Sequence, residues 1–429
     1  MANVNRYSTA NMYANTISML SKQQKELADQ IEHVSAKQKV LRASDDPVGA
    51  AQAERARTRL SRLDTDQRAL DAQTATITYG ESSLGEMMDA LQKFRELTVN
   101  AGNGTFTQTE RDALVQQMES LRSQILGYAN RKDSNGLPLF RGLDSQEQII
   151  SGQYNYDAQP GQQSSSDYGI ASSLDGALAF MSGSTGNGVL AVELGVEVTP
   201  ATTPPTYTPN TGKAWSNVGT IKDPSAAAAF VGPQTIQFSV AADGTTTYSV
   251  VDSAGNPVMD TATPPAPMTN LAYKSGDAIR VGGMDLVITG VPADGDGFTV
   301  KQSERTDLFS VLDSAIATAR NSGKMDGTTA FGELAHGLAK VQAEIDTAMN
   351  RVSTVRSYAG DLMQQSKRIS ETLMARDEQM EGQRAAAEDM NDSEYIAALS
   401  KLQNQQTTVS AAMQSYASIQ KLSLFNFIN

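Results

Sequence analysis

Proline placement divides this chain of 429 residues into three stretches. Twelve of its 14 prolines lie between Pro160 and Pro292, and only Pro47 and Pro138 lie outside that range. Because proline breaks the interior of a helix, the two flanks are free to form long helices and the middle is not. We therefore expect a mainly α fold with an inserted β domain.

The two ends of the chain carry the same apolar ladder, in which the steps alternate between four and three residues. A strict seven-residue repeat is typical of helices that bury a narrow seam against other helices. We expect long N- and C-terminal coiled-coil helices that pack together in a helical bundle, with a subunit interface along the ladders and the apolar residues after the second one. The candidate interface residues are Tyr13, Ile17, Leu20, Leu27, Ile31, Val34, Leu41, Tyr395, Leu399, Leu402, Val409, Met413, Tyr416, Leu422, Leu424, Phe425 and Phe427.

Two arrangements can bury these ladders, and they are compatible with each other. The helices can pair within one chain, or they can pack against helices of neighbouring copies, which we favour. Glutamines occupy four ladder positions, and polar residues in such a seam fix the register of the helices at a cost in stability. The four are Gln24, Gln38, Gln406 and Gln420.

Two helix starts are marked in the first flank. Asp46 precedes Pro47, and a short acidic side chain followed by proline is a favourable N-cap. Thr107 with Glu110 forms the spacing of a capping box. These signals predict a helix from about 47 to the Ala101–Gly104 stretch, and a second helix after Thr107.

The middle of the chain changes to short runs of β-branched residues separated by turn residues. We expect strands at Val189–Val198, Thr235–Val240, Thr245–Val251, Ala278–Val281, Met284–Thr289 and Phe298–Val300. Asp243-Gly244 predicts a hairpin turn between the second and third of these. The expected segments are an N-terminal assembly helix (1–43) that pairs with a C-terminal one (392–429), two bundle parts (44–150 and 305–391), and an outer β domain (151–304).

Composition narrows the classes of function. The net charge is −13, and residues 1–70 carry only 11 Lys or Arg against 8 Asp or Glu, so a strongly basic nucleic-acid domain is not expected. The absence of cysteine excludes disulfides and thiolate metal sites. We expect no transmembrane helix and no general secretory signal, because long apolar runs are missing. The basic run fits a solvated or salt-bridged face better than a nucleic-acid site, and it consists of Arg55, Arg57, Arg59, Arg62 and Arg68.

Candidate chemical sites are few. Asp45 and Asp46 are adjacent, so they do not share a helix face, and helix capping explains them better than acid–base catalysis does. Residues 294–297 (DGDG) resemble a calcium loop faintly but lack its further ligands, so a turn is expected. His33 and His336 are the only histidines. We expect no enzymatic activity, no catalytic residue, no metal site and no cofactor.

Several strings resemble the bacterial flagellin superfamily, across about 1–150 and 305–429. The strings are residues 6–9 (RYST), 34–53 (VSAKQKVLRASDDPVGAAQA), 135–142 (NGLPLFRG) and 419–427 (IQKLSLFNF). The SDDP and LSLF forms are similar to the hook-associated branch of that superfamily, and ordinary flagellins end differently. Residues 36–38 (AKQ) stand where the family usually has a glycine-containing turn.

The resemblance implies a structural subunit of the flagellum, exported unfolded through its type III apparatus and held outside the cell at the hook–filament junction. Its implied partners are identical subunits in a ring, hook-associated protein 1, flagellin and an export chaperone before secretion, with no nucleic acid and no membrane insertion. Two alternatives stay open. One is a flagellin, the filament's bulk subunit, and the other is a cell-surface enzyme with its activity in the central domain.

Overall fold

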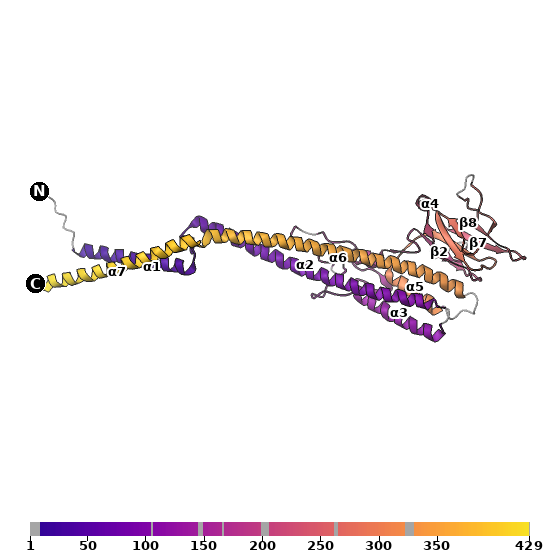
Figure 1. The fold of residues 1–429 in the computed structure, drawn as a ribbon, viewed down its shortest axis with the longest axis horizontal. Coiled ribbons are helices and arrows are strands. Elements are labelled where there is room, and N and C mark those ends of the chain that lie inside the picture. The colour runs from indigo at the N-terminus through magenta and orange to yellow at the C-terminus, as the bar shows by residue number, and fades with distance from the viewer. Residues whose placement is uncertain are drawn as a thin grey trace. The chain divides into compact units, whose positions relative to one another are not determined.

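The computed structural model describes residues 9–103, 106–144, 149–164, 167–198, 206–260, 265–321 and 330–428, and its flanks are helical (Figure 1). This confirms the predicted fold class, with a β-rich region inserted between long helices. The helices are α1 (Thr9–Ala36), α2 (Pro47–Ala101), α3 (Gln108–Ala129), the short α4 (Pro224–Ala228), α5 (Leu308–Asn321), α6 (Ala330–Glu388) and α7 (Asp392–Ile428).

Packing divides the chain into two compact units, residues 1–70 with 368–429 and residues 71–367. In the first unit, α1 lies along α7, and the start of α2 contacts the end of α6 through an ion pair of 2.8 Å between Arg57 and Glu388. Each pairing joins a segment of the N-terminal flank to a segment of the C-terminal flank, so the contacts of this unit form only when both flanks are present.

The second unit contains a helical bundle built from α2, α3, α5 and α6. Its core is formed by apolar side chains at helical spacing, which explains why these segments fold as helices that pack along one face. Bidentate contacts from Arg95 to Asp346 and from Arg122 to Asp313 join α2 to α6 and α3 to α5. Fully buried core residues include Ile77, Leu84, Met87, Leu91, Phe94, Met118, Ile125, Phe309, Leu312, Ile345 and Val352.

The β-rich region has one five-stranded antiparallel sheet of order β2-β12-β7-β8-β9 and a second sheet of order β10-β11-β5, in which β6 also pairs with β11. Two further pairs are β1 with β13 and β3 with β4. The strands are β1 (Gly183–Ser184), β2 (Leu190–Leu194), β3 (Val196–Glu197), β4 (Tyr207–Thr208), β5 (Trp215–Ser216), β6 (Thr220–Ile221), β7 (Gln234–Val240), β8 (Thr246–Asp252), β9 (Leu271–Ala272), β10 (Ala278–Val281), β11 (Met284–Thr289), β12 (Gly297–Gln302) and β13 (Arg305–Thr306).

All six predicted strands are present, with the first divided into β2 and β3 at Gly195. The predicted hairpin turn joins β7 to β8, and Gly244 has a φ of +84°, a conformation that suits glycine. The inward side chains of these strands form a separate apolar core that includes Ile236, Phe238 and Phe298.

The described residues between α3 and the first strand pack on the bundle instead of forming strands. Gly152–Tyr154 is a 3-10 turn and Ala177–Met181 a π-helical turn. The Tyr154 ring stacks on Phe309 of α5 at 5.2 Å, and its hydroxyl donates to Asp313. This segment therefore anchors the β-rich region to α5.

The prediction that the N-terminal ladder stays helical through Leu41 is wrong. The helix α1 ends at Ala36, and Lys37 has a φ of +54°, in the left-handed region that stops a helix. Gln38 and Leu41 therefore lie in the connector to α2, outside the helical repeat. The backbone leaves the helix because its N–H groups find partners elsewhere, as Lys39 N donates to Glu388 O over 2.7 Å.

Candidate assembly interface

The terminal helices α1 and α7 form an antiparallel pair in the first unit. Gln30 Nε2 donates to Ala398 O over 3.4 Å, and the Lys37 ammonium lies 5.5 Å from the centre of the Tyr395 ring. Higher residue numbers in α1 thus meet lower numbers in α7, which brings the two ladders together along the helices.

The pair covers only one of the two heptad positions in each ladder. We call these the covered rows, and their side chains are buried or half-buried between α1 and α7. Val34 is 9% exposed and Val409 is 6% exposed. The covered rows consist of Leu20, Leu27 and Val34 in α1, and Tyr395, Leu402, Val409 and Tyr416 in α7.

The other heptad position stays exposed in both helices, and we call these side chains the open rows. Ile17 and Ile31 are 44% and 43% exposed, and Leu399 and Met413 are 48% and 44% exposed. A glutamine lies midway in each row, so both read apolar, Gln, apolar at seven-residue spacing. A seam of this width exceeds what one partner helix can cover. The open rows are Ile17, Gln24 and Ile31 in α1, and Leu399, Gln406 and Met413 in α7.

The remaining predicted interface residues divide into two groups. Leu41 is half-buried in the connector that follows α1, away from the helical rows. The side chains of the others lie outside the described part of the chain, although their backbones belong to α1 and α7. These are Tyr13, Leu422, Leu424, Phe425 and Phe427.

The breaks that set off α1 and α7 are hydrogen-bonded to each other, and we call this contact the joint. Gln38 and Asp389 form an isolated antiparallel bridge. Met390 N donates to Lys37 O over 2.9 Å, and the Lys39 ammonium donates to Ala386 O over 2.8 Å. The joint therefore satisfies backbone groups that both helix ends would otherwise leave unpaired.

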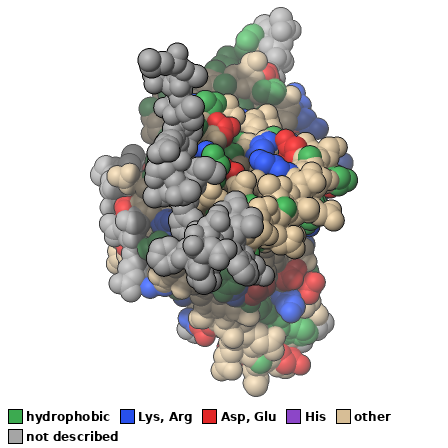
Figure 2. Space-filling model, turned by 90° about the vertical axis from the view of Figure 1, so that its left-hand side faces the viewer, with side chains coloured by type: hydrophobic (Ala, Val, Ile, Leu, Met, Phe, Trp, Pro, Cys, Tyr) green, Lys and Arg blue, Asp and Glu red, His purple; other side chains and the backbone are tan. Residues whose placement is uncertain are grey.

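Charged side chains surround the joint. Glu388, whose side chain is 7% exposed, binds Arg57 over 2.8 Å and Arg384 over 3.2 Å. Hydrogen bonds to Glu381 raise the pKa of Arg384, with a further contribution from Asp389. Because a buried carboxylate needs such partners, part of the basic run predicted as a salt-bridged face has a structural role here. The face drawn in Figure 2 presents both basic and acidic side chains.

Side-chain caps mark the starts of three helices. Asp46 Oδ1 accepts from Val48 N over 3.0 Å at the start of α2. At the start of α3, Thr107 and Glu110 exchange both hydrogen bonds of a capping box. Asn391 and Glu394 form the same reciprocal pair before α7, at 2.9 Å each way. That Asn-x-x-Glu signal is visible in the sequence but was not among the predicted caps, although its spacing is that of a capping box.

The carboxylates considered for other chemistry have structural partners. Asp45 accepts from the Arg42 and Leu41 N–H groups, which hold its pKa below the ordinary value. Asp296 is buried and accepts from the backbone of Thr211, Gly212 and Ala293, so residues 294–297 brace a loop. In the part of the chain that the structure describes, no group of His, Asp or Glu is placed to hold a metal ion. None of the described helices has an apolar stretch long enough to cross a bilayer.

Known proteins share this architecture. Residues 7–145 match the family described as the bacterial flagellin N-terminal helical region. Hook-associated protein 3 of Salmonella typhimurium is 30% identical over 188 residues, which cover 42% of this chain and 55% of that protein. The Escherichia coli protein of the same name is 30% identical over 141 residues, covering 33% of this chain and 44% of the relative. The matches thus span about half the length of these curated relatives.

A solved structure gives the wider comparison. The crystal structure of flagellar hook-associated protein 3 from Legionella pneumophila superposes with a TM-score of 0.67 at 25% identity, over 77% of this chain and 97% of that one. The crystal structure of FlgL from Xanthomonas campestris, at 21% identity and a TM-score of 0.63, has the same fold. The chain is a protein of the flagellin superfamily. Within that superfamily, the relatives and solved structures that it resembles include proteins named hook-associated protein 3 and FlgL.

Proposed function

We propose that this chain is a structural adaptor of the bacterial flagellum, which joins hook-associated protein 1 at the hook to the flagellin filament by coiled-coil packing of its terminal helices. The observation that carries the proposal is the pair of open rows on α1 and α7. The names of the similar proteins give independent support, because they place relatives of this chain at the flagellar hook and junction.

The open rows are suited to contacts with neighbouring molecules. Each Ile, Leu or Met side chain buried there would contribute about 1.5–3 kcal/mol, and repetition around a ring of identical subunits multiplies that contribution. Gln24 and Gln406 would oppose sliding of the helices, because an unpaired amide in an apolar seam is costly. Such a surface can bind tightly and still select one register.

The other partners follow from the same role. A subunit that lies outside the cell at the junction has to be exported, and an apolar row on an unassembled α7 needs cover before export. We therefore infer an export chaperone that binds the C-terminal helix, and we assign the chain no enzymatic activity. In this proposal α1 and α7 are the assembly helices, α2, α3, α5 and α6 form the bundle, and the β-rich region is the outer domain.

The open rows provide the test. In cells that make a Met413→Gln variant in place of the original protein, we expect filaments to detach, since a polar side chain enters the seam. Met259→Gln is the matched control, because Met259 is 52% exposed in the β-rich region, away from the rows. Electron microscopy counts the filaments that remain attached to cells.

A second variant removes the last thirty residues and should leave a folded middle that cannot join hook to filament. Firm attachment of filaments in both variants would refute the adaptor role. If the chain is instead a filament subunit, it will dominate the protein sheared from cells, whereas a junction protein will be scarce there.

A further inference from the structure

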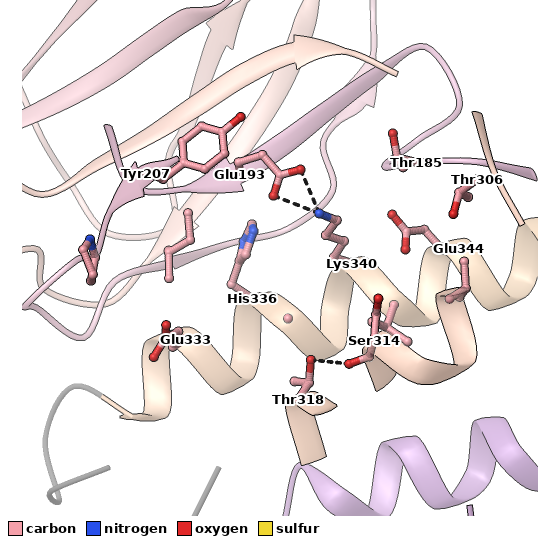
Figure 3. Close-up of a pocket in the computed structure, with 15 residues that line it drawn as sticks. Thr185, Glu193, Tyr207, Thr306, Ser314, Thr318, Glu333, His336, Lys340 and Glu344 are labelled. Carbon is pink, nitrogen blue, oxygen red and sulfur yellow. Dashed lines mark hydrogen bonds and ion pairs between the residues drawn. The ribbon is translucent and has the colours of Figure 1, made fainter. Parts of the chain in front are cut away.

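Three polar side chains on one face of α6 hold the β-rich region, each by a different segment. We call His336, Lys340 and Glu344 the α6 stripe, and they are spaced four residues apart, about one helical turn. Figure 3 shows them projecting from α6 toward the strands. Because residues at this spacing share a helix face, the stripe acts on the β-rich region along one line.

The contacts of the stripe reach three separate places. His336 Nδ1 lies 3.0 Å from Ser216 Oγ in β5. The Lys340 ammonium lies 2.8 Å from both carboxylate oxygens of Glu193 in β2. Glu344 accepts from Gly186 N over 3.2 Å, in the turn that precedes β2.

A cavity of about 420 Å³ lies beside these contacts, lined by residues of α5, α6 and the strands, with all three stripe residues on its wall. Close packing of side chains is therefore interrupted between α6 and the strands at this place. His336 and Glu344 are each only 5% exposed. The polar contacts of the stripe bridge a gap that apolar packing does not fill.

The charges around the stripe balance at neutral pH. Glu193 and Glu344 carry two negative charges, and Lys340 and Lys301, which lies 3.5 Å from Glu193, carry two positive ones. Burial raises the pKa of Glu344. Burial also opposes ionisation of Glu193, but Lys340 and Lys301 outweigh it and hold that pKa below its ordinary value.

His336 is neutral in this arrangement. Burial, reinforced by the nearby Lys340 charge, lowers the pKa of His336 to about 4. The other titratable groups that face the cluster are Tyr207 and Glu333 on the cavity wall, and the exposed Glu304, which pairs with Lys301.

We propose that the α6 stripe is an acid-released latch, which fixes the β-rich region on α6 at neutral pH and frees it when Glu344 and His336 take up protons. Protonation of these two groups changes the net charge of the five-residue cluster from zero to +2. The added charge lies close to Lys340 in a poorly solvated place, where like charges repel strongly. The bundle core, built from apolar side chains, carries no such charge and should stay folded.

Two natural probes test the latch on the full chain. Trp215 is the only tryptophan, and it precedes Ser216, the partner of His336, in β5. As the pH is lowered, we expect Trp215 fluorescence to change near the pH at which His336 titrates, while the helical circular dichroism signal stays constant. A His33→Asn variant leaves His336 as the sole histidine, so nuclear magnetic resonance follows its protonation directly.

Variants then link the two signals. Glu344→Gln and His336→Asn each remove one of the two proton sites, so each should shift the fluorescence midpoint by roughly one pH unit. Glu378→Gln is the control, since Glu378 is exposed on the same helix, 34 residues after Glu344. If a stripe variant fails to fold, the titration of the His33→Asn variant still shows whether His336 takes up its proton at the pH of the fluorescence change. Loss of helix together with the fluorescence change, or a His336 midpoint at its ordinary value, would overturn the proposal.

Discussion

Gln38 and Asp389 are 351 residues apart in the sequence, yet they face each other across an antiparallel bridge at the joint. Each lies in a break between two long helices, one between α1 and α2 and the other between α6 and α7. The two breaks thus form one structural feature. Neither arm of the α1–α7 pair can change its direction at the joint without disturbing the hydrogen bonds of the other.

The left-handed conformation of Lys37 predicts an unusual order of stability. In the interior of a helix, Gly is less stable than Ala by about 1 kcal/mol. At a φ of +54°, the order should reverse, because an L-residue with a Cβ pays about 1–2 kcal/mol there. We expect Lys37→Gly to be more stable than Lys37→Ala by about 1 kcal/mol in urea unfolding. Both variants lose the contact with Tyr395, so the difference between them reports only the backbone conformation at position 37. Equal stability of the two variants would contradict the prediction.

Val409 and Met413 are neighbours on α7 that belong to different rows. We expect Val409→Ala to destabilise the isolated protein by about 1.5 kcal/mol, since it removes two buried methyl groups. Met413→Ala should change the free energy of unfolding by less than about 0.5 kcal/mol, because its side chain is exposed. Thermal unfolding of each purified variant, followed by circular dichroism, measures both changes in stability. A larger effect at Met413 would show that the open row is already covered within the chain.

The capping box of α3 gives a third prediction. Thr107→Ala removes the oxygen that accepts from Glu110 N, and such a loss costs about 1 kcal/mol. Thr109→Ala is the control, since Thr109 is exposed in the first turn and caps nothing. Urea unfolding followed by circular dichroism distinguishes them. Similar losses for both substitutions would mean that the cap contributes little.

Tyr156 makes stability depend on alkaline pH. Burial, with help from Asp175, raises the pKa of Tyr156, whose hydroxyl donates to Phe140 O over 2.8 Å. The unfolded chain loses this proton near pH 10 while the folded protein keeps it, so stability falls as pH rises above about 10.

Tyr156→Phe should therefore be about 1 kcal/mol less stable than the original protein near neutrality. That difference should shrink as the pH is raised past about 10. Denaturant unfolding at several pH values measures it, and Tyr79→Phe serves as a control at an exposed tyrosine. A difference that stays constant with pH would mean that Tyr156 ionises equally in both states.

Local patterns in the sequence predicted much of the fold. The helical flanks follow from four-three spacing without proline, and the strands follow from β-branched runs between turn residues. The end of α1 was missed because Gln38 and Leu41 continue the ladder, whereas the helix stops when Lys39 pairs with a segment nearly 350 residues away. The ladder itself carries no signal of this tertiary cause, and only the family resemblance, which has a turn at residues 36–38, indicated a break there.

The candidate site was predicted only as a set of residues. Ile31 and Val34 are both apolar ladder positions, and the sequence does not distinguish them. Packing against α7 leaves Ile31 exposed and buries Val34. The partners of His336 could not be predicted either, since Ser216 lies 120 residues away in a different type of element.

The repeat of the terminal ladders has a consequence for how such proteins can vary in size. Seven residues make two turns, about 10.5 Å of helix. Adding or deleting one such block in α1, with a compensating block opposite it in α7, alters the reach of the arms and leaves the same sides of both helices pointing outward. The length of the arms can therefore change while the pattern of exposed side chains stays constant.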